Sequence, residues 1–213
     1  KTGLTIVKEN ENIDRFRGRV VFPIRSRSGR ILGFGGRILG SSKNIAKYIN
    51  SPESLIYQKS KVLYGIFESK QSIVKNDNCF LVEGYTDVIK MHQCGISNVV
   101  ASSGTALTEN QIRLINRLTK NITVVFDGDA AGSRAALRGI DLILEQGMNV
   151  KICNLPEGDD PDSFVSNKNL EEVQSYLNKN SKDFIVYKAS LLLDDSENDP
   201  VKKAAVIRDM VES

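Results

Sequence analysis

The sequence predicts an α/β fold built on a mainly parallel sheet, and three observations support this prediction. Short apolar runs rich in Val, Ile and Phe recur between residues 78 and 155. Stretches with helical spacing separate these runs, which is the rhythm of consecutive β–α–β units. The chain has 213 residues, 40% of them hydrophobic and 26% charged, which suits a globular protein with a substantial core.

The first third of the chain is expected to form a basic α+β unit. The runs VVFPI and RILGF between residues 15 and 39 predict two strands, with a turn at SRSG between them. Pro23 fits an edge strand or a bulge, because proline cannot donate a ladder hydrogen bond. Residues 40–60 predict a loop with a short helix, and residues 63–75 have helical spacing.

Charge is divided unevenly along the chain, although the net charge is only +3. Residues 1–75 contain 15 lysines and arginines against 5 acidic residues, whereas residues 76–213 contain 14 against 21. Seven arginines and no acidic residue lie between Arg15 and Arg37. A solvated basic hairpin is one interpretation, but uncompensated arginines favour an anionic partner such as a nucleic acid or a nucleotide.

The second part of the chain predicts alternating strands and helices. Strands are expected at CFLVE, NVVAS, ITVVFD and NVKICNL, with helices between them. Thr108 is a candidate N-cap with Gln111 three residues on, and Gly147 is placed to end the helix before the last strand. After Asp162 we expect only helices. We therefore divide the chain into three parts: 1–76, 77–165 and 166–213.

Six carboxylates in three short blocks form the candidate chemical site. The blocks EGYTD, DGDAAG and GDDPD each follow a predicted strand. Because the carboxyl ends of parallel strands meet at one sheet edge, the blocks are expected to converge. Converging carboxylates repel each other unless cations neutralise them, and oxygen-only ligand sets suit Mg2+ or Mn2+. The candidate metal ligands are Glu83, Asp87, Asp127, Asp129, Asp160 and Asp162.

Each block also has a plain structural interpretation. An Asp-x-Asp pair after a strand can be an ordinary polar loop, Asp87 can be a helix-start carboxylate, and GDDPD can supply a turn with a helix cap. Three such blocks at strand ends of one fold make a shared site the stronger interpretation. Between Asp127 and Asp159 the chain lacks the further motifs of a haloacid-dehalogenase-type phosphatase, and the spacing of an EF-hand is absent.

Other patterns narrow the class of protein. The three cysteines are widely spaced and include no CxxC pair, so we expect reduced thiols and neither a zinc site nor a disulfide framework. No apolar run approaches the roughly 20 residues of a membrane span, and no signal peptide opens the chain. We expect a cytoplasmic protein with no membrane partner. Because the chain opens with Lys1, we also expect a fragment of a longer protein.

The three acidic blocks resemble those of the Toprim domain, which bacterial primases, topoisomerases and some small nucleases share. The flanking blocks RFRGRVVFPIRSRSGRILGFGGRILG, KYINSPES and KVLYG, with FLVEGYTDVI and ITVVFDGDAAG, are similar to the catalytic core of bacterial DnaG-type DNA primase. The resemblance extends from about Arg15 to Phe164. It implies a Toprim-type sheet flanked by helices, a partial basic α+β subdomain before it and a helical segment after it.

The resemblance also implies roles for individual residues. Glu83, Asp127 and Asp129 would be the catalytic carboxylates, and two or more Mg2+ or Mn2+ ions would be the cofactors. Whether Glu83 acts as a metal ligand or as a general acid or base stays open. The basic unit would contact template and nucleotide phosphates. The residues expected to do so are Arg15, Arg17, Arg37, Lys47, Tyr48, Asn50 and Lys59.

The implied activity is the synthesis of short RNA primers on single-stranded DNA from nucleoside triphosphates, by metal-dependent nucleotidyl transfer. The implied further partner is a replicative helicase, bound through a C-terminal domain that this chain lacks, and we expect a monomer. Because other parts of the family's architecture are missing too, we expect weak or no activity from this fragment alone. Two alternatives stay open: another Toprim enzyme of the topoisomerase or nuclease kind, and a non-catalytic nucleic-acid-binding module.

Overall fold

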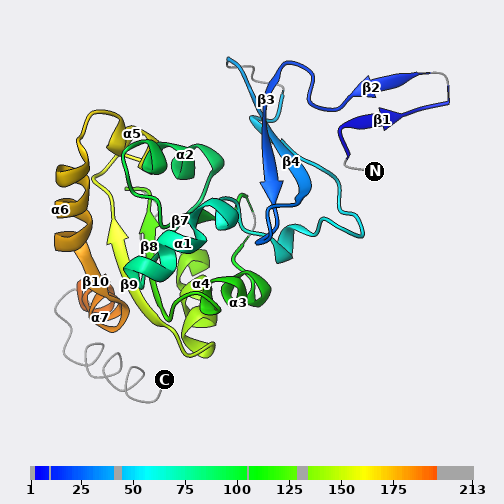
Figure 1. Cartoon of the computed structure of the whole chain (residues 1–213). Coiled ribbons are helices and arrows are strands. Elements are labelled where there is room, and N and C mark those ends of the chain that lie inside the picture. The colour runs from blue at the N-terminus through cyan, green and yellow to red at the C-terminus, as the bar shows by residue number, and fades with distance from the viewer. Residues whose placement is uncertain (1–2, 10, 41–44, 105, 129–133, 196–213) are drawn as a thin grey trace.

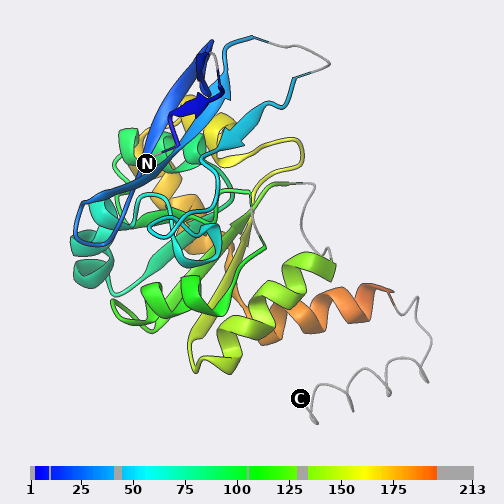
Figure 2. The ribbon, with the colours of Figure 1, turned by 90° about the vertical axis from the view of Figure 1, so that its right-hand side faces the viewer.

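The computed structural model describes residues 3–9, 11–40, 45–104, 106–128 and 134–195. An N-terminal unit of short strands lies to one side of a larger sheet that helices cover (Figure 1). The same arrangement is visible in the view turned by 90° (Figure 2). The α/β class predicted from the chain is therefore confirmed.

The N-terminal unit contains two small antiparallel sheets. Its strands are β1 (Thr5–Val7), β2 (Asn12–Asp14), β3 (Arg19–Arg25), β4 (Ile31–Ile38) and β5 (Tyr48–Asn50). β1 pairs with β2, and the second sheet has the order β3-β4-β5. The predicted hairpin is confirmed, and Pro23 lies on the edge strand β3, just before a register shift at Ile24. β5 was not predicted, because only its pairing with β4 identifies it as a strand.

The larger unit consists of a five-stranded sheet and its helices. Its strands are β6 (Cys79–Val82), β7 (Val99–Ala101), β8 (Asn121–Phe126), β9 (Asn149–Asn154) and β10 (Ser181–Asp183). The helices are the 3-10 helix η1 (Lys59–Lys61), α1 (Ile66–Asn76), α2 (Tyr85–Gln93), α3 (Glu109–Asn116), α4 (Arg134–Glu145), α5 (Pro161–Ser166), α6 (Leu170–Asn180) and α7 (Phe184–Asp195).

The strand order of this sheet is β10-β9-β8-β6-β7, and β6 to β9 are mutually parallel. This confirms the predicted β–α–β series. β10 corrects the expectation of helices alone after Asp162, since residues 181–183 pair antiparallel with β9. The strand is short and polar, so its sequence carries no strand pattern. The last predicted helix falls on residues 196–213, which lie outside the described residues.

Helices bury both faces of the sheet, as a parallel sheet requires. α1, α3, α4 and α7 cover one face, where Ile112, Ile122 and Ile143 are among the fully buried side chains. α2, α5 and α6 cover the other face, where Phe164 and Val173 are buried against Val82, Val125 and their neighbours. The strands that carry the acidic loops are therefore packed between two apolar layers.

Local signals act as predicted at two helix ends. Thr108 caps α3 by accepting a hydrogen bond from the Gln111 N–H, and the Gln111 side chain in turn accepts one from the Thr108 N–H. Gly147 has a φ of +67°, the left-handed conformation that glycine adopts readily after a helix. Within the described part of the chain, no helix combines the length and apolarity needed to traverse a bilayer.

Candidate catalytic site

The acidic blocks lie at the carboxyl ends of three neighbouring strands. Glu83 follows β6, Asp127 follows the adjacent β8, and the GDDPD block follows β9 on the far side of β8. The last two loops are in direct contact, because the Gly128 N–H donates a hydrogen bond to the Asp159 carbonyl at 2.9 Å. The structure therefore brings the described parts of the three blocks to one edge of the sheet.

Gly128 allows this contact between the β8 and β9 loops. A Cβ atom at this position would lie 2.1 Å from the carbonyl oxygen of Pro156 and 2.8 Å from the Cα of Glu157. Both neighbours are backbone atoms and cannot rotate away. The Gly of the DGD sequence is thus needed for close approach, and the loop that carries Asp127 depends on it.

Asp87 is buried at the start of α2, with 7% of its surface exposed. Its Oδ2 accepts a hydrogen bond from the Gly84 N–H at 2.7 Å, which satisfies a free donor at the beginning of the helix. The pKa of Asp87 is raised to about 6, mainly by burial, with the Gly84 bond acting in the opposite direction. The negative charges of Asp160, Asp162 and Glu83 also raise this pKa, so the carboxylates of the EGYTD and GDDPD blocks act on one another.

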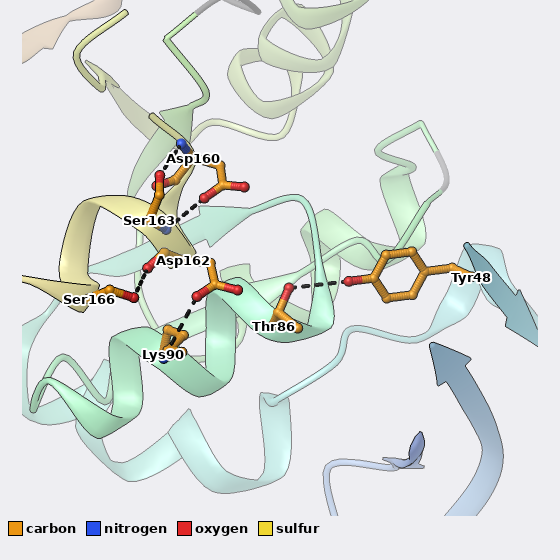
Figure 3. Close-up of polar contacts among 7 residues, drawn as sticks. All are labelled: Tyr48, Thr86, Lys90, Asp160, Asp162, Ser163 and Ser166. Carbon is orange, nitrogen blue, oxygen red and sulfur yellow. Dashed lines mark hydrogen bonds and ion pairs between the residues drawn. The ribbon is translucent and has the colours of Figure 1, made fainter. Parts of the chain in front are cut away.

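The GDDPD carboxylates have partners within the chain (Figure 3). Asp160 caps α5, because its side chain accepts a hydrogen bond from the Ser163 N–H at 2.7 Å. Asp162 forms an ion pair with Lys90 of α2, with 3.9 Å between Oδ1 and Nζ. The cap interpretation thus applies to Asp160, and Asp162 helps to hold α5 against α2 in addition to lying near Asp87.

The metal ligand set is only partly described. Asp129 lies outside the described residues. Among the described residues no three His, Cys, Asp or Glu side chains form a ready metal-binding group. Glu83 is exposed, and Asp127 is partly buried at its strand end. The candidate donors described at this edge are carboxylate oxygens, and the charges of Glu83, Asp160 and Asp162 raise the pKa of Asp87. Oxygen donors of this kind fit a hard divalent cation such as Mg2+ or Mn2+.

A cationic groove lies beside this acidic edge. Arg37 and Lys47 flank the ring of Tyr48, with 5.8 Å and 6.0 Å from their charged groups to the ring centroid. The groove has a volume of about 830 Å³ and an apolar floor that includes Val20, Phe22 and Ile89. Thr86 lines it too, and Thr86 is the neighbour of Asp87 in the chain.

The other predicted nucleic-acid residues are distributed differently. Asn50 lies at the end of β5 and accepts a hydrogen bond from the Tyr85 hydroxyl at 2.6 Å. Lys59 lies in η1 and lines a small pocket with Tyr85 and Ser103, close to the acidic edge. Arg15 and Arg17 lie in the turn between β2 and β3, outside the set of described residues that line the groove.

Sequence reasoning missed the residues that join the two units and one that holds an acidic loop in place. Tyr85 and Thr86 contact Asn50 and Tyr48, respectively, and Lys90 contacts the GDDPD block. Only the position of Tyr85 and Thr86 between two candidate ligands hinted at a role. The pairing partners come from distant parts of the chain, so no local pattern identifies them.

Comparison with known proteins agrees with this geometry. The Toprim-like family matches residues 80–165, and the N-terminal domain of the DNA primase catalytic core matches residues 1–70. A curated DNA primase of Clostridium acetobutylicum is 45% identical over 189 residues, which cover 88% of this chain and 31% of the relative. The chain thus spans about a third of the length of the curated relatives that it matches.

Solved structures give the same result. A DNA primase domain from Pseudomonas aeruginosa is 38% identical, with a TM-score of 0.85 over 96% of this chain and 64% of that one. A DnaG primase catalytic domain bound to ssDNA is 35% identical, with a TM-score of 0.83 over 96% of this chain and 67% of that one. The fold, the acidic edge and these similarities agree, and the chain belongs to the family of bacterial DnaG-type DNA primases.

Proposed function

We propose that this chain is part of the catalytic core of a DNA-directed RNA polymerase that synthesises short primers on single-stranded DNA. The observation that carries the proposal is the placement of a cationic groove directly beside a carboxylate edge, on either side of the start of α2. One surface suits the phosphates of a nucleic acid, and the other suits cations. Nucleotidyl transfer needs both at close range.

The acidic edge is proposed as the site of nucleotidyl transfer. Glu83, Asp127 and Asp129 are the proposed catalytic ligands, and Asp87, Asp160 and Asp162 complete the acidic centre. Two divalent ions held by these carboxylates would supply Lewis-acid activation of the attacking 3′-hydroxyl and would neutralise the pyrophosphate leaving group. The protein backbone orients the carboxylates. The Gly128 N–H holds the Asp127 loop against the β9 loop, and the Gly84 N–H fixes the side chain of Asp87.

The groove is proposed to hold the template. Arg37 and Lys47 would bind its phosphates, while the ring of Tyr48 and the apolar floor would contact unstacked bases. A similar DnaG catalytic domain was solved bound to ssDNA, which supports single-stranded DNA as the proposed ligand. The proposed incoming substrates are nucleoside triphosphates. Two further predictions remain: contact with a replicative helicase, and a monomeric state.

The proposal is tested with an isosteric change at the acidic edge of the intact protein. Asp127→Asn removes one negative charge and keeps the side-chain shape. We expect the rate of primer synthesis to fall by at least about 100-fold, because removing one group that stabilises charge in a transition state typically lowers the rate by this factor. Binding of single-stranded DNA should change less than about twofold. Both are measured on the same protein, by extension assay and by fluorescence anisotropy.

A double variant in the groove is expected to lose DNA binding and to keep metal binding, the opposite of what is expected for Asp127→Asn. Arg37→Ala combined with Lys47→Ala should weaken the binding of single-stranded DNA and leave the binding of Mn2+, measured by calorimetry, unchanged.

Three outcomes would contradict the proposal. Equal loss of DNA binding and primer synthesis in folded Asp127→Asn protein would contradict the separate roles of the groove and the acidic edge. DNA cleavage in place of primer synthesis would favour the topoisomerase or nuclease alternative, and metal-independent binding alone would favour a non-catalytic module.

A further inference from the structure

Tyr85 of α2 is one of the side chains through which the N-terminal unit contacts the larger unit. Only 2% of its surface is exposed. Its ring stacks on Phe22 of β3, with centroids 5.3 Å apart and planes 6° apart, and meets the edge of Tyr64 at 4.7 Å. Gly35 of β4 lies against the same ring, since a Cβ there would be 2.6 Å from the Tyr85 Cζ.

Two hydroxyl contacts cross the same junction. The Tyr85 Oη donates to the Asn50 Oδ1 at 2.6 Å. The Tyr48 Oη lies 3.3 Å from the Thr86 Oγ1 (Figure 3). The ring contacts are broad and non-directional, whereas the Tyr85–Asn50 bond is short and directional.

Both residues of this hydrogen bond are close in sequence to residues of the proposed site. Tyr85 is two residues from Glu83 and two from Asp87. Asn50 is two residues from Tyr48, and in the sheet Tyr48 is paired with Arg37. Two hydrogen bonds therefore connect the strands that carry the cationic groove to the helix start that carries the carboxylates, and the Tyr85–Asn50 bond is the shorter of them.

We propose that the Tyr85–Asn50 hydrogen bond is a positioning contact that sets the template groove relative to the acidic edge. Asn50 then acts through Tyr85 and not by contact with nucleic acid. The inference rests on the proposed function. It identifies one contact that fixes the position of the template groove relative to the carboxylates. Reacting groups must lie within a fraction of an ångström of their productive distance, so a small loosening of this junction slows turnover without abolishing either binding surface.

The kinetic test uses Tyr85→Phe, Asn50→Ala and the double variant in the intact protein. Tyr85→Phe keeps the ring stack and removes only the donor. We expect each single variant to lower kcat by about 3- to 10-fold, with the template KM and Kd within about twofold of the parent protein. Because both changes delete one bond, the double variant should be no slower than the slower single variant.

A control separates this effect from general loss of a tyrosine hydroxyl. The Tyr176 Oη donates to the Asn154 carbonyl at 2.9 Å, away from the junction. Tyr176→Phe should leave kcat within about twofold of the parent value, since it removes a comparable bond elsewhere. Losses that multiply in the double variant, or a parallel loss of template affinity in Tyr85→Phe, would overturn the proposal.

A second measurement does not depend on primer synthesis. Amide hydrogen exchange of the intact protein should be at least about fivefold faster over β4 and β5 in Tyr85→Phe and in Asn50→Ala, and unchanged in the parallel strands β6 and β8. Unchanged exchange in β4 and β5, or faster exchange throughout the large sheet, would refute a local positioning role. If exchange changes as expected but the parent protein makes no primers, the proposed function fails and the coupling of the two units stands.

Discussion

At the scale of single residues, the acidic edge depends as much on glycine as on carboxylate. Gly84 and Gly128 stand next to Glu83 and Asp127, and each brings backbone into a place where a side chain would intrude. At Gly84 the nearest atom is the Oδ2 of Asp87, at 2.9 Å from an added Cβ. The carboxylates are therefore placed by the smallest residues beside them.

Gly128→Ala is expected to separate the two acidic loops. Because the new Cβ would meet a backbone carbonyl at 2.1 Å, the loops must move apart, and we expect the free energy of unfolding to fall by about 1–3 kcal/mol. Primer synthesis should be abolished. Chemical denaturation and extension assays measure the two effects.

The matched control is Gly139→Ala within α4, where an added Cβ meets only the Leu107 Cβ at 3.8 Å. This change should stabilise the protein by about 0.5–1 kcal/mol, because alanine is the better helix former. A Gly128→Ala protein that matches the Gly139→Ala protein in stability would show that the loop contact is dispensable.

At the scale of elements, a buried polar contact joins α1, α2 and β7. Ser69 of α1 donates to the Val99 carbonyl at 2.7 Å and lies 3.0 Å from the Nε2 of His92 in α2. Burial lowers the pKa of His92, with Glu68 acting in the opposite direction. The neutral imidazole is therefore the form that the packed helices favour.

This contact predicts a pH dependence of stability. The unfolded chain takes up a proton at His92 near pH 6.5, whereas the folded protein takes it up only at lower pH, so the free energy of unfolding falls as the pH drops below about 6.5. We expect the stability difference between the parent protein and His92→Gln to shrink from about pH 7.5 to about pH 5.5. Urea titrations across this range measure it, and a constant difference would mean that His92 does not titrate differently on folding.

At the scale of the whole molecule, opposite charges occupy neighbouring surfaces. The basic residues cluster before residue 76 and the acidic ones after it, yet the junction at α2 places both beside one helix start. The groove binds polyanions in the proposed function, so its affinity should follow the release of counterions. The acidic edge next to it repels phosphates until cations neutralise it.

The salt dependence of template binding tests this arrangement. Removing the charges of Arg37 and Lys47 should reduce the slope of log K against log salt by about 0.7 for each phosphate that these side chains neutralise in the parent protein. Lys179→Ala, on the exposed surface of α6, should leave the slope unchanged. Equal slopes for the groove variants and the control would place the template elsewhere on the molecule.

Local sequence patterns were sufficient to predict the β–α–β series, the basic hairpin with Pro23 at its edge and the placement of the acidic blocks after strands. These features follow from local periodicity, turn chemistry and charge, which neighbouring residues specify without help from the rest of the chain. Strand-end convergence is a general property of parallel sheets, so it too was predictable.

The order of the strands in the sheet and the contacts between distant side chains could not be predicted in this way, because they depend on the folded arrangement of the whole chain. The order β9-β8-β6 places the Asp127 loop between the other two, and β5 and β10 exist only through pairing with distant strands. The ion pair of Asp162 with Lys90 and the bond of Tyr85 to Asn50 join residues 72 and 35 positions apart. Such contacts depend on how the layers pack, and packing is a property of the whole chain that no local segment encodes.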